Sequence, residues 1–404
     1  MTSRIHMMRR ASAQAANGRE AAMHLRLSFA LVFMLLLACA PAQAQEPQTM
    51  PAQKKVLCVD CPGAIVVKDN GAQAARLIDA PEGVKLIEEP GIIVWTPTAG
   101  QAGQHVIKVG INQGEGERIR QYDILVKPLE RVLFVFAHSD DEFPIFSKLI
   151  HFVRTGKDVR CIWLVNKEGR HLESQEAMDK IGLPAEKLFK AGQELATVES
   201  LKLASDRILA LLEEFPPDQV YMPQYECGHN QHDMAHFCAL DAALRHGFEG
   251  QLYEFGLYNF HGGGPNLFSL IPAAMPSIRF TQDQQTVKLI ESLIPIYKSQ
   301  KAVTSYFNLA LTPQQRCNTF YRPVAKWDFT RRPHTGMLWY ELRANTRNDV
   351  FDKVAALTQD YLQAYPRSQD LVGMLEQDRP PNQLEICRPL VLIDPASVVQ
   401  PAQE

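Results

Sequence analysis

The sequence predicts an α/β protein, with a parallel sheet and flanking helices preceded by a small all-β, sandwich-like domain. From residue 131 onward, short continuous apolar runs alternate with segments of helical periodicity, as in strand-helix-strand units whose strands are buried on both faces. Between residues 55 and 128, apolar and polar residues alternate and glycines mark the turns, which is typical of half-buried antiparallel strands. These two patterns divide the chain into an all-β part and an α/β part.

Length and composition bound the domain organisation and the partners. With 404 residues, of which 46% are hydrophobic and 22% charged, the chain is long enough for two domains with tails. We expect the β domain at 45–128, the α/β domain at 129–365 and a C-terminal extension at 366–404. The formal net charge of −3 offers no basic excess for a phosphate backbone, so nucleic acid is not an expected partner.

Residues 1–44 predict a signal peptide. Basic residues up to Arg26 precede the apolar stretch Leu27–Ala38, which is too short to span a membrane and is followed by small residues. Cleavage after Ala44 is the interpretation we favour. The alternative is a lipid attached at Cys39, because LLAC resembles a bacterial lipoprotein box. We therefore expect an exported protein, periplasmic or secreted, whose only tie to a membrane would be that lipid.

Export would place the eight cysteines in an oxidising compartment, so disulfides are expected before redox catalysis. Cys58 and Cys61 form a C-x-x-C that proline and glycine follow, and no helix pattern comes after it, which argues against a thioredoxin-type site. A local disulfide, or pairing with Cys387, is the expectation. Cys161 and Cys238 stand in apolar patterns and are expected to be buried as small hydrophobic residues.

Two alternating runs in the β domain predict a hairpin, with its turn at 114–116. Their inward residues are Ile107, Val109 and Ile111 in the first run and Tyr122, Ile124 and Val126 in the second. The segment VWTPTAGQAGQHVIKVGI is similar to the W-x-P…G-x-H-x-V-x-V strand pair of bacterial immunoglobulin-like or cadherin-like modules. We expect a spacer or packing module here, with weak carbohydrate binding as the alternative.

The elements of the α/β domain follow from apolar periodicity. The central strand is Val132–Ala137, and the helix after it repeats apolar residues from Ile145 to Val153. Further strands are expected at 158–165, 219–222 and 251–258, and helices around 173–180, from a cap at residue 197 to 212, at 282–301 and at 348–365. The glycine-rich loop at 261–265 would form a lip of a cleft.

One imidazole and three carboxylates follow the central strand directly, and three imidazoles follow the strand at 219–222. These residues are His138, Asp140, Asp141 and Glu142 in the first cluster and His229, His232 and His236 in the second. Ionised carboxylates are costly to bury without partners, so the first cluster is not explained by packing. Because both clusters lie at the carboxyl ends of strands in one sheet, we expect them to meet there.

Such a set of side chains suits a metal ion. Two imidazoles and one carboxylate are ligands for Zn²⁺, and three protein ligands leave the open position of a catalytic site. The ion would lower the pKa of its bound water to about 7 and polarise a carbonyl, which suits amide hydrolysis. Hydrolysis also needs a base for the proton of the water and a donor for the oxyanion. We expect Asp233 and Asp241 to orient the imidazoles through their second nitrogens.

The two clusters carry a resemblance to a known family. AHSDDE at 137–142 resembles the (A/P)-H-P-D-D-E motif, and GHNQH at 228–232 the G-H-x-D-H motif, of the PIG-L or LmbE-like zinc-dependent N-acetylglucosaminyl deacetylases. The resemblance extends over about residues 130–345. It implies a Rossmann-like α/β layer and removal of the acetyl group from an N-acetylglucosamine unit of a lipid, thiol or other glycoconjugate.

The resemblance also implies residue roles. The implied zinc ligands are His138, Asp141 and His232. Asp140 would be the general base that activates the attacking water, and His229 would donate to the oxyanion or the leaving amine. Glu142 would help to hold the loop.

Three positions depart from the family pattern. Ser139 replaces a proline, which frees a backbone angle between two implied ligands. Gln231 replaces an aspartate that could polarise His229, so His229 would be a poorer acid unless Asp233 takes that part. Cys227 stands where a bulky residue or a glycine is common, so the pocket near the oxyanion would differ in shape.

Several alternatives stay open. The departures at 139 and 231 motivate a non-catalytic carbohydrate-binding protein that keeps the metal site, and a third possibility is a hydrolase of another amide. Asp140 could only complement a helix dipole, and His236 could be an imidazole ligand. His261 and His334 could line the cleft or simply pack, and the segment at 339–340 is more typical of core than of a sugar platform.

Overall fold

A computed structural model describes residues 48–67, 74–112, 116–165, 168–301, 305, 316–325, 327–342, 349–366 and 391–397. The predicted signal peptide, Cys39 and Cys387 lie outside these ranges. Gln48–Glu404 form one compact unit, and the predicted division into domains at 45–128 and 129–365 stays a prediction. No helix within the described ranges has the length and apolar character that a membrane span requires.

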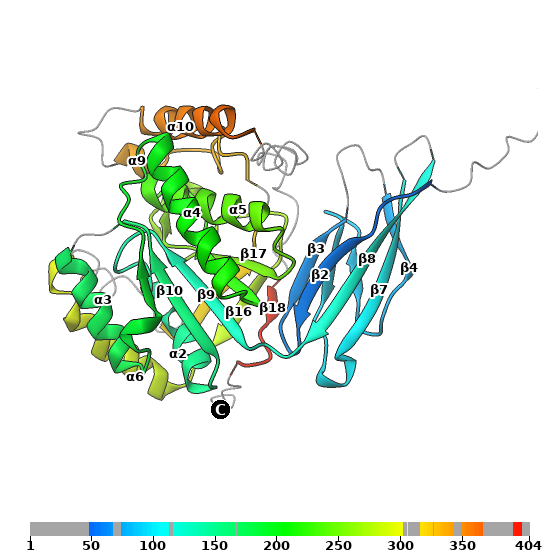
Figure 1. Cartoon of the computed structure of the whole chain (residues 1–404), viewed down its shortest axis with the longest axis horizontal. Coiled ribbons are helices and arrows are strands. Elements are labelled where there is room, and N and C mark those ends of the chain that lie inside the picture. The colour runs from blue at the N-terminus through cyan, green and yellow to red at the C-terminus, as the bar shows by residue number, and fades with distance from the viewer. Residues whose placement is uncertain are drawn as a thin grey trace, which may run out of the picture. The chain divides into compact units, whose positions relative to one another are not determined.

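The strands before residue 128 form two sheets (Figure 1). The larger has the order β1-β8-β7-β4 with β2 also paired to β8, and the smaller has the order β3-β6-β5. Their bounds are β1 Gln48–Thr49, β2 Gln53–Cys58, β3 Gly63–Val66, β4 Ala74–Asp79, β5 Lys85–Ile87, β6 Ile92–Trp95, β7 Gly103–Asn112 and β8 Glu117–Lys127. The predicted hairpin is confirmed as β7 and β8, and its six inward residues are at most 1% exposed. The likeness to immunoglobulin-like or cadherin-like modules stays a prediction.

The prediction of a local disulfide is wrong, because Cys58 and Cys61 are both free thiols. Cys58 ends β2 and is fully buried, and the amide of Cys61 donates to its carbonyl at 3.2 Å in a turn where Asp60 has a φ of +57°. The two cysteine side chains are hydrogen-bonded to each other. Cys161 and Cys238 are fully buried, as predicted.

One eight-stranded sheet organises the rest of the described chain. Its order is β11-β10-β9-β12-β13-β17-β16-β18. The bounds are β9 Arg131–Phe136, β10 Asp158–Trp163, β11 Leu188–Lys190, β12 Gln219–Pro223, β13 Gln251–Phe255, β16 Ser277–Thr281, β17 Asn318–Pro323 and β18 Val391–Ile393. The strands from β11 to β13 are parallel, whereas β17 runs antiparallel to both β13 and β16. The predicted central strand therefore lies inside the parallel part, between β10 and β12.

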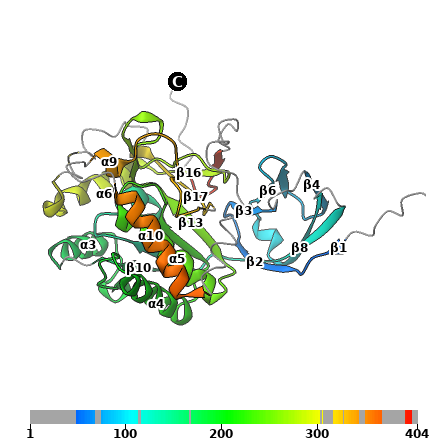
Figure 2. The same cartoon turned by 90° about the horizontal axis from the view of Figure 1, so that it is seen from above.

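Helices cover both faces of this sheet (Figures 1 and 2). One layer holds α4 Val198–Glu214, α5 Asn230–His246 and α10 Val350–Ala364, and the other holds α2 Phe146–Arg154, α3 Glu168–Lys180 and α6 Gln284–Leu293. Within β9, Leu133 and Val135 pack against the first layer, whereas Phe134 and Phe136 pack against the second. A strand buried on both faces explains the continuous apolar run in the sequence.

The predicted helices are found with small changes in their bounds. Thr197 caps α4 by accepting a hydrogen bond from the amide of Ser200. The helix expected at 282–301 ends as α6 at Leu293, and two 3-10 turns at 294–296 and 298–300 follow it because Pro295 has no amide hydrogen to donate. Within the predicted extension, β18 adds to the edge of the large sheet beside β16.

Candidate metal centre

The loop after β9 presents the first cluster. His138 and Asp141 stand just beyond the carboxyl end of the strand and are 8% and 3% exposed. The amide of His138 donates to Oδ2 of Asp141 at 2.7 Å, which closes the loop on itself. The imidazole and the carboxylate are therefore held side by side before any ligand arrives.

Asp140 occupies a strained position in this loop. Its φ is +116°, in a region that favours glycine and costs other residues about 1–3 kcal/mol. Asp140 precedes the 3-10 turn Phe143–Ile145 and lies outside α2. Burial, with the carboxylates of Asp141 and Glu142 close by, raises the pKa of Asp140 well above its usual value. A carboxylate made more basic in this way is suited to accept a proton.

Glu142 holds the loop in place through hydrogen bonds. Its carboxylate is fully buried and accepts hydrogen bonds from the amide of Asp140 at 2.9 Å, from Oγ of Ser174 at 2.5 Å and from the hydroxyl of Tyr297 at 2.5 Å. Burial raises the pKa of Glu142, and these donors oppose that rise. The supporting part that the resemblance implied for Glu142 thus has a structural basis, with two partners that the sequence did not single out.

The second cluster opens α5. His229 is the N-cap residue of the helix, and His232 lies in its first turn at 2% exposure. The glycine of the motif is needed at position 228, because a Cβ there would lie 2.0 Å from the carbonyl oxygen of Tyr258. The close approach of these two backbones fixes where the helix begins and hence where both histidines point.

The two clusters meet, as predicted. Nε2 of His232 lies 3.1 Å from Nδ1 of His138 and 3.2 Å from Oδ1 of Asp141, and Oδ2 of Asp141 lies 3.8 Å from Nδ1 of His138. Ligand atoms at 2.0–2.2 Å from a tetrahedral Zn²⁺ would stand about 3.3 Å from one another. Two of the three separations are close to this value and the third, between Asp141 and His138, is longer, so these three side chains are candidates to hold one such ion.

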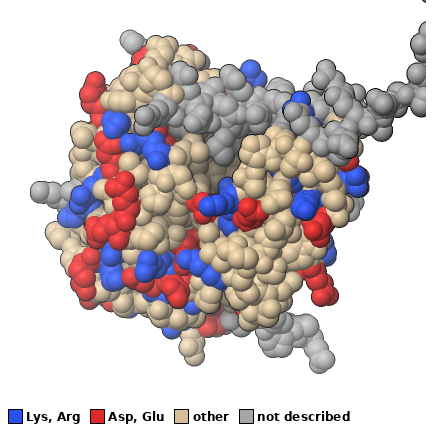
Figure 3. All heavy atoms as spheres, turned by 45° about the vertical axis from the view of Figure 1, so that its right-hand side comes forward, with Lys and Arg blue, Asp and Glu red and all other residues tan. Residues whose placement is uncertain are grey.

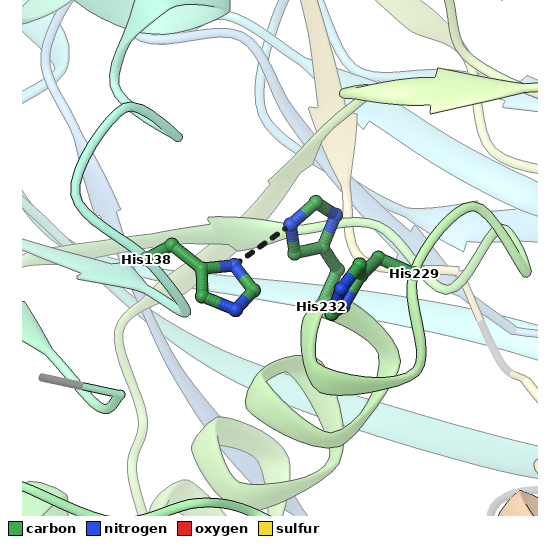
Figure 4. Close-up of side chains that lie close together, drawn as sticks. All are labelled: His138, His229 and His232. Carbon is green, nitrogen blue, oxygen red and sulfur yellow. Dashed lines mark hydrogen bonds between the residues drawn. The ribbon is translucent and has the colours of Figure 1, made fainter. Parts of the chain in front are cut away.

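His229 lies beside His138 and His232 (Figure 4). The described residues also form a three-histidine group of His138, His229 and His232, whose ligand atoms lie within 4.8 Å of one another. His229 is thus close enough to be either a ligand or a neighbouring donor. Its Nδ1 accepts a hydrogen bond from the amide of Gln231 at 3.2 Å, so the ring hydrogen of the neutral imidazole is on Nε2. That tautomer suits a donor, and the choice between the two roles stays a prediction.

Gln231, the departure from the family motif, orients a predicted ligand. Its Nε2 donates to the carbonyl oxygen of Glu194 at 2.5 Å, which turns its Oε1 toward Nε2 of His138 at 2.7 Å. Because an amide oxygen only accepts, His138 carries its hydrogen on Nε2 and presents a bare Nδ1 to the other ligands. The amide therefore does for His138 what a carboxylate often does for a metal-bound imidazole.

The expectation that Asp233 and Asp241 orient the imidazoles is wrong. Asp233 accepts hydrogen bonds from the amides of residues 226 and 227, at 3.0 and 3.2 Å, and from the hydroxyl of Tyr340. Asp241 accepts from Nε of Arg245 and the hydroxyl of Tyr361, both at 2.8 Å. Both carboxylates therefore hold the helix in place. Nδ1 of His232 has no hydrogen-bond partner among the described residues.

His236 does not join the cluster. Its ring is fully buried, with Nδ1 2.6 Å from the carbonyl oxygen of Pro223 and 3.8 Å from the carboxylate of Glu254. Burial lowers the pKa of His236, which favours a neutral ring. The spacing of His232 and His236 is explained by one helix face, and His236 is a packed core histidine.

Glu226 is a structural residue of the site that the sequence did not indicate. It is fully buried and accepts hydrogen bonds from the amides of Leu257 and Tyr258 at 3.1 and 2.8 Å, which ties the segment after β13 to the segment before His229. Burial raises its pKa to about 7, against the hydrogen bonds from Gln224 and Tyr258 that lower it. A glutamate standing between a strand and a histidine motif was the only signal in the sequence.

The raised pKa of Glu226 predicts how stability depends on pH in the metal-free protein. Below pH 4.5 the carboxyl is protonated in the folded and unfolded states, and between pH 4.5 and about 7 the folded state holds the proton more tightly. Stability is therefore lost as pH rises through this window, by about 3 kcal/mol. Glu226→Gln should remove this loss, measured as the free energy of urea unfolding at pH 4.5, 6 and 8. Parallel pH profiles for the two proteins would contradict it.

Gln231 provides a prediction on metal affinity. Gln231→Ala should weaken Zn²⁺ binding about 10- to 100-fold, because His138 loses the partner that fixes its ring. Competition with a chromogenic chelator measures the dissociation constant. Gln285→Ala, at an exposed position in α6, is the matched control and should bind as the unchanged protein does. Equal affinities in all three proteins would show that Gln231 does not support the site.

Imidazoles and a carboxylate converge at the carboxyl ends of two parallel strands. The protein therefore belongs to the class of α/β proteins with a candidate metal centre. Residues 133–243, which contain both clusters, match the PIG-L family, described as GlcNAc-PI de-N-acetylase. No curated protein matches the chain. The shared segment holds His138, Asp140, Asp141, His229 and His232, and assigning individual roles to them stays a prediction.

Three solved structures are similar to about half of this chain at low sequence identity. A triple mutant of the deacetylase in the teicoplanin biosynthetic pathway is 12% identical, with 48% of this chain and 97% of that chain covered and a TM-score of 0.38. The N,N'-diacetylchitobiose deacetylase from Pyrococcus horikoshii is 15% identical, with 49% and 84% covered and a TM-score of 0.35. A conserved protein from Thermus thermophilus is 17% identical, with 52% and 100% covered and a TM-score of 0.36.

Proposed function

We propose that the protein is a zinc-dependent amide hydrolase that removes acetyl groups from N-acetylglucosamine-type sugars of a glycoconjugate or polysaccharide. The observation that carries the proposal is the convergence of His138, Asp141 and His232 within 3.8 Å at the carboxyl end of the sheet. The match of residues 133–243 to the PIG-L family supports the reaction and the class of substrate.

In the proposed reaction, His138, Asp141 and His232 would hold the ion, and Asp140 would accept the proton of the attacking water. When bound, the ion would lower the pKa of water and polarise the acetyl carbonyl. The raised pKa of Asp140 makes it a stronger base, and in the sequence it lies between two of the proposed ligands, which supports this role. His229, with its hydrogen on Nε2, donates to the oxyanion or to the leaving amine.

The proposal on partners and location follows from the sequence. A sugar substrate is expected at the site, whereas nucleic acid is not, and on the face shown in Figure 3 basic and acidic side chains are interspersed. We further propose export to the periplasm or the medium, on the strength of residues 1–44 and with Cys39 as a possible lipid site. Mass spectrometry of the N-terminus of the mature chain would distinguish cleavage after Ala44 from lipid attachment.

Acetate release tests the proposed function. The purified protein is incubated with N-acetylglucosamine oligomers, first as prepared, then after a chelator, then after Zn²⁺ is restored. Acetate that is released, lost and regained in this order supports the deacetylase. Sugar binding without acetate would support the binding protein, and acid release only from non-sugar amides would support the other hydrolase. The last two outcomes each overturn the proposal.

A further inference from the structure

Three aromatic side chains adjoin the candidate metal centre. The ring of Tyr258 lies 5.2 Å from the ring of His232, centroid to centroid, and 5.3 Å from the ring of Trp339. Phe260 lies 6.2 Å from the same indole. Tyr258, Phe260 and Trp339, here called the aromatic platform, therefore extend from a predicted metal ligand to the beginning of α9 Trp339–Leu342.

The platform keeps part of its surface open to solvent. All three of its side chains are of intermediate exposure. The other tryptophans of the chain, Trp95, Trp163 and Trp327, are 3%, 0% and 5% exposed. The neighbour of Trp339 in the sequence is also buried, since Tyr340 is 5% exposed and donates its hydroxyl to Asp233. Tyr340 is thus the core residue that the sequence suggested, whereas Trp339 is not.

The platform is built into the site. Tyr258 is fixed by the hydrogen bond from its amide to Glu226, and its carbonyl oxygen is the atom that excludes a side chain at position 228. Tyr258 and Asn259 form β14, which pairs antiparallel with β15 Asn266–Leu267. The same structure that positions His229 and His232 therefore positions the first ring of the platform.

Two imidazoles, one of them next to Phe260 in the chain, lie close to each other. His261 follows Phe260 in the chain, and its ring lies 5.6 Å from the ring of His334, which is 4% exposed. Nδ1 of His261 and Nε2 of His334 have no hydrogen-bond partner within the described ranges. Burial lowers the pKa of both imidazoles, so both are neutral at pH 7, and the two unpartnered nitrogens are enclosed by protein.

We propose that the aromatic platform binds a second sugar ring, next to the N-acetylated sugar at the metal centre, so that the preferred substrate is an oligosaccharide of two or more sugars. This inference rests on the proposed function for the identity of the first sugar. A pyranose ring has an apolar face of C–H groups, which the partly exposed rings of the platform are suited to cover.

Kinetics with short and long substrates test the platform. The kcat/KM of acetate release is measured for the methyl glycoside of N-acetylglucosamine and for its β-1,4-linked trimer. We expect the unchanged protein to prefer the trimer, and Trp339→Ala to lower that preference about tenfold through KM for the trimer. Trp339→Phe should keep most of the preference. Leu342→Ala, at an exposed position of the same helix, is the matched control and should keep all of it.

A binding measurement makes the test independent of turnover. Trp339 is the one tryptophan of the four that is not buried. Binding of the trimer should therefore quench the tryptophan fluorescence that comes from Trp339, and Trp339→Phe should abolish that change. Quenching without acetate from any substrate would uphold the platform while the proposed function fails. Equal kcat/KM for the two substrates, or an equal loss on both in Trp339→Ala, would overturn the platform while the deacetylase stands.

Discussion

Asp140→Asn should lower kcat for acetate release by about 10²- to 10⁴-fold and leave the metal content unchanged. The amide has the size of the carboxylate but cannot accept a proton. Asparagine also tolerates positive φ about as well as aspartate does, so the loop should keep its conformation. Acetate release measures kcat, and elemental analysis measures the metal.

The pH dependence of the same reaction gives an internal check on Asp140. Because burial and two neighbouring carboxylates raise the pKa of Asp140, activity should fall on the acid side as that carboxylate takes up a proton. Asp140→Asn should remove this acid limb from its residual activity. Asp179→Asn, at an exposed position in α3, is the matched control and should behave as the unchanged protein. Turnover by Asp140→Asn within a few-fold of the control would exclude Asp140 as the base.

His232→Ala should abolish both metal binding and turnover. Nε2 of His232 is the atom closest to both other predicted ligands, so its removal takes away the centre of the trio. Removing a metal ligand should weaken binding by more than the about 10- to 100-fold that loss of a supporting group costs. Metal per chain, by elemental analysis after gel filtration, is the measurement.

His229→Ala separates the two roles that the geometry allows for His229. A donor to the oxyanion can be removed without loss of the ion, so this variant should keep its metal and lose about 10²- to 10³-fold in kcat. If His229→Ala loses the metal as His232→Ala does, the centre is the three-histidine group and the role of Asp141 must be revised. Retention of metal by His232→Ala would contradict the proposed centre altogether.

The placement of the centre could be predicted because periodicity and position carry that information. A run such as Val132–Ala137 is buried on both faces only in an inner strand, and residues that follow inner parallel strands share one edge of the sheet. The meeting of His138, Asp141 and His232 follows from those two facts and from the start of a helix at the second cluster.

The partners of individual polar atoms could not be predicted in the same way. Asp233 and Asp241 have the spacing of residues that could support the histidines, yet backbone amides, Tyr340, Arg245 and Tyr361 take up their oxygens. Those donors come from segments up to 120 residues away, and their approach depends on packing rather than on local pattern.

Short edge strands were not predicted, because their formation also depends on the surrounding structure rather than on local pattern. The strands β11 and β18 have three residues each, too few for a period to be visible, and they exist because the edges of the sheet offer unpaired backbone groups. The antiparallel strands β16 and β17 are longer. β16 alternates between polar and apolar residues over only five positions, whereas the last three residues of β17 are all buried and its sequence does not alternate. Their presence was decided by the rest of the sheet.

A glycine at position 140 would relax the loop. The backbone of Asp140 is held at a φ of +116°, and a residue without a Cβ would recover about 1–3 kcal/mol of folding free energy there. It would also delete the carboxylate. Thermostability therefore favours glycine at position 140, whereas the proposed turnover requires aspartate. A screen for heat-resistant variants would enrich inactive protein with a substitution at this site.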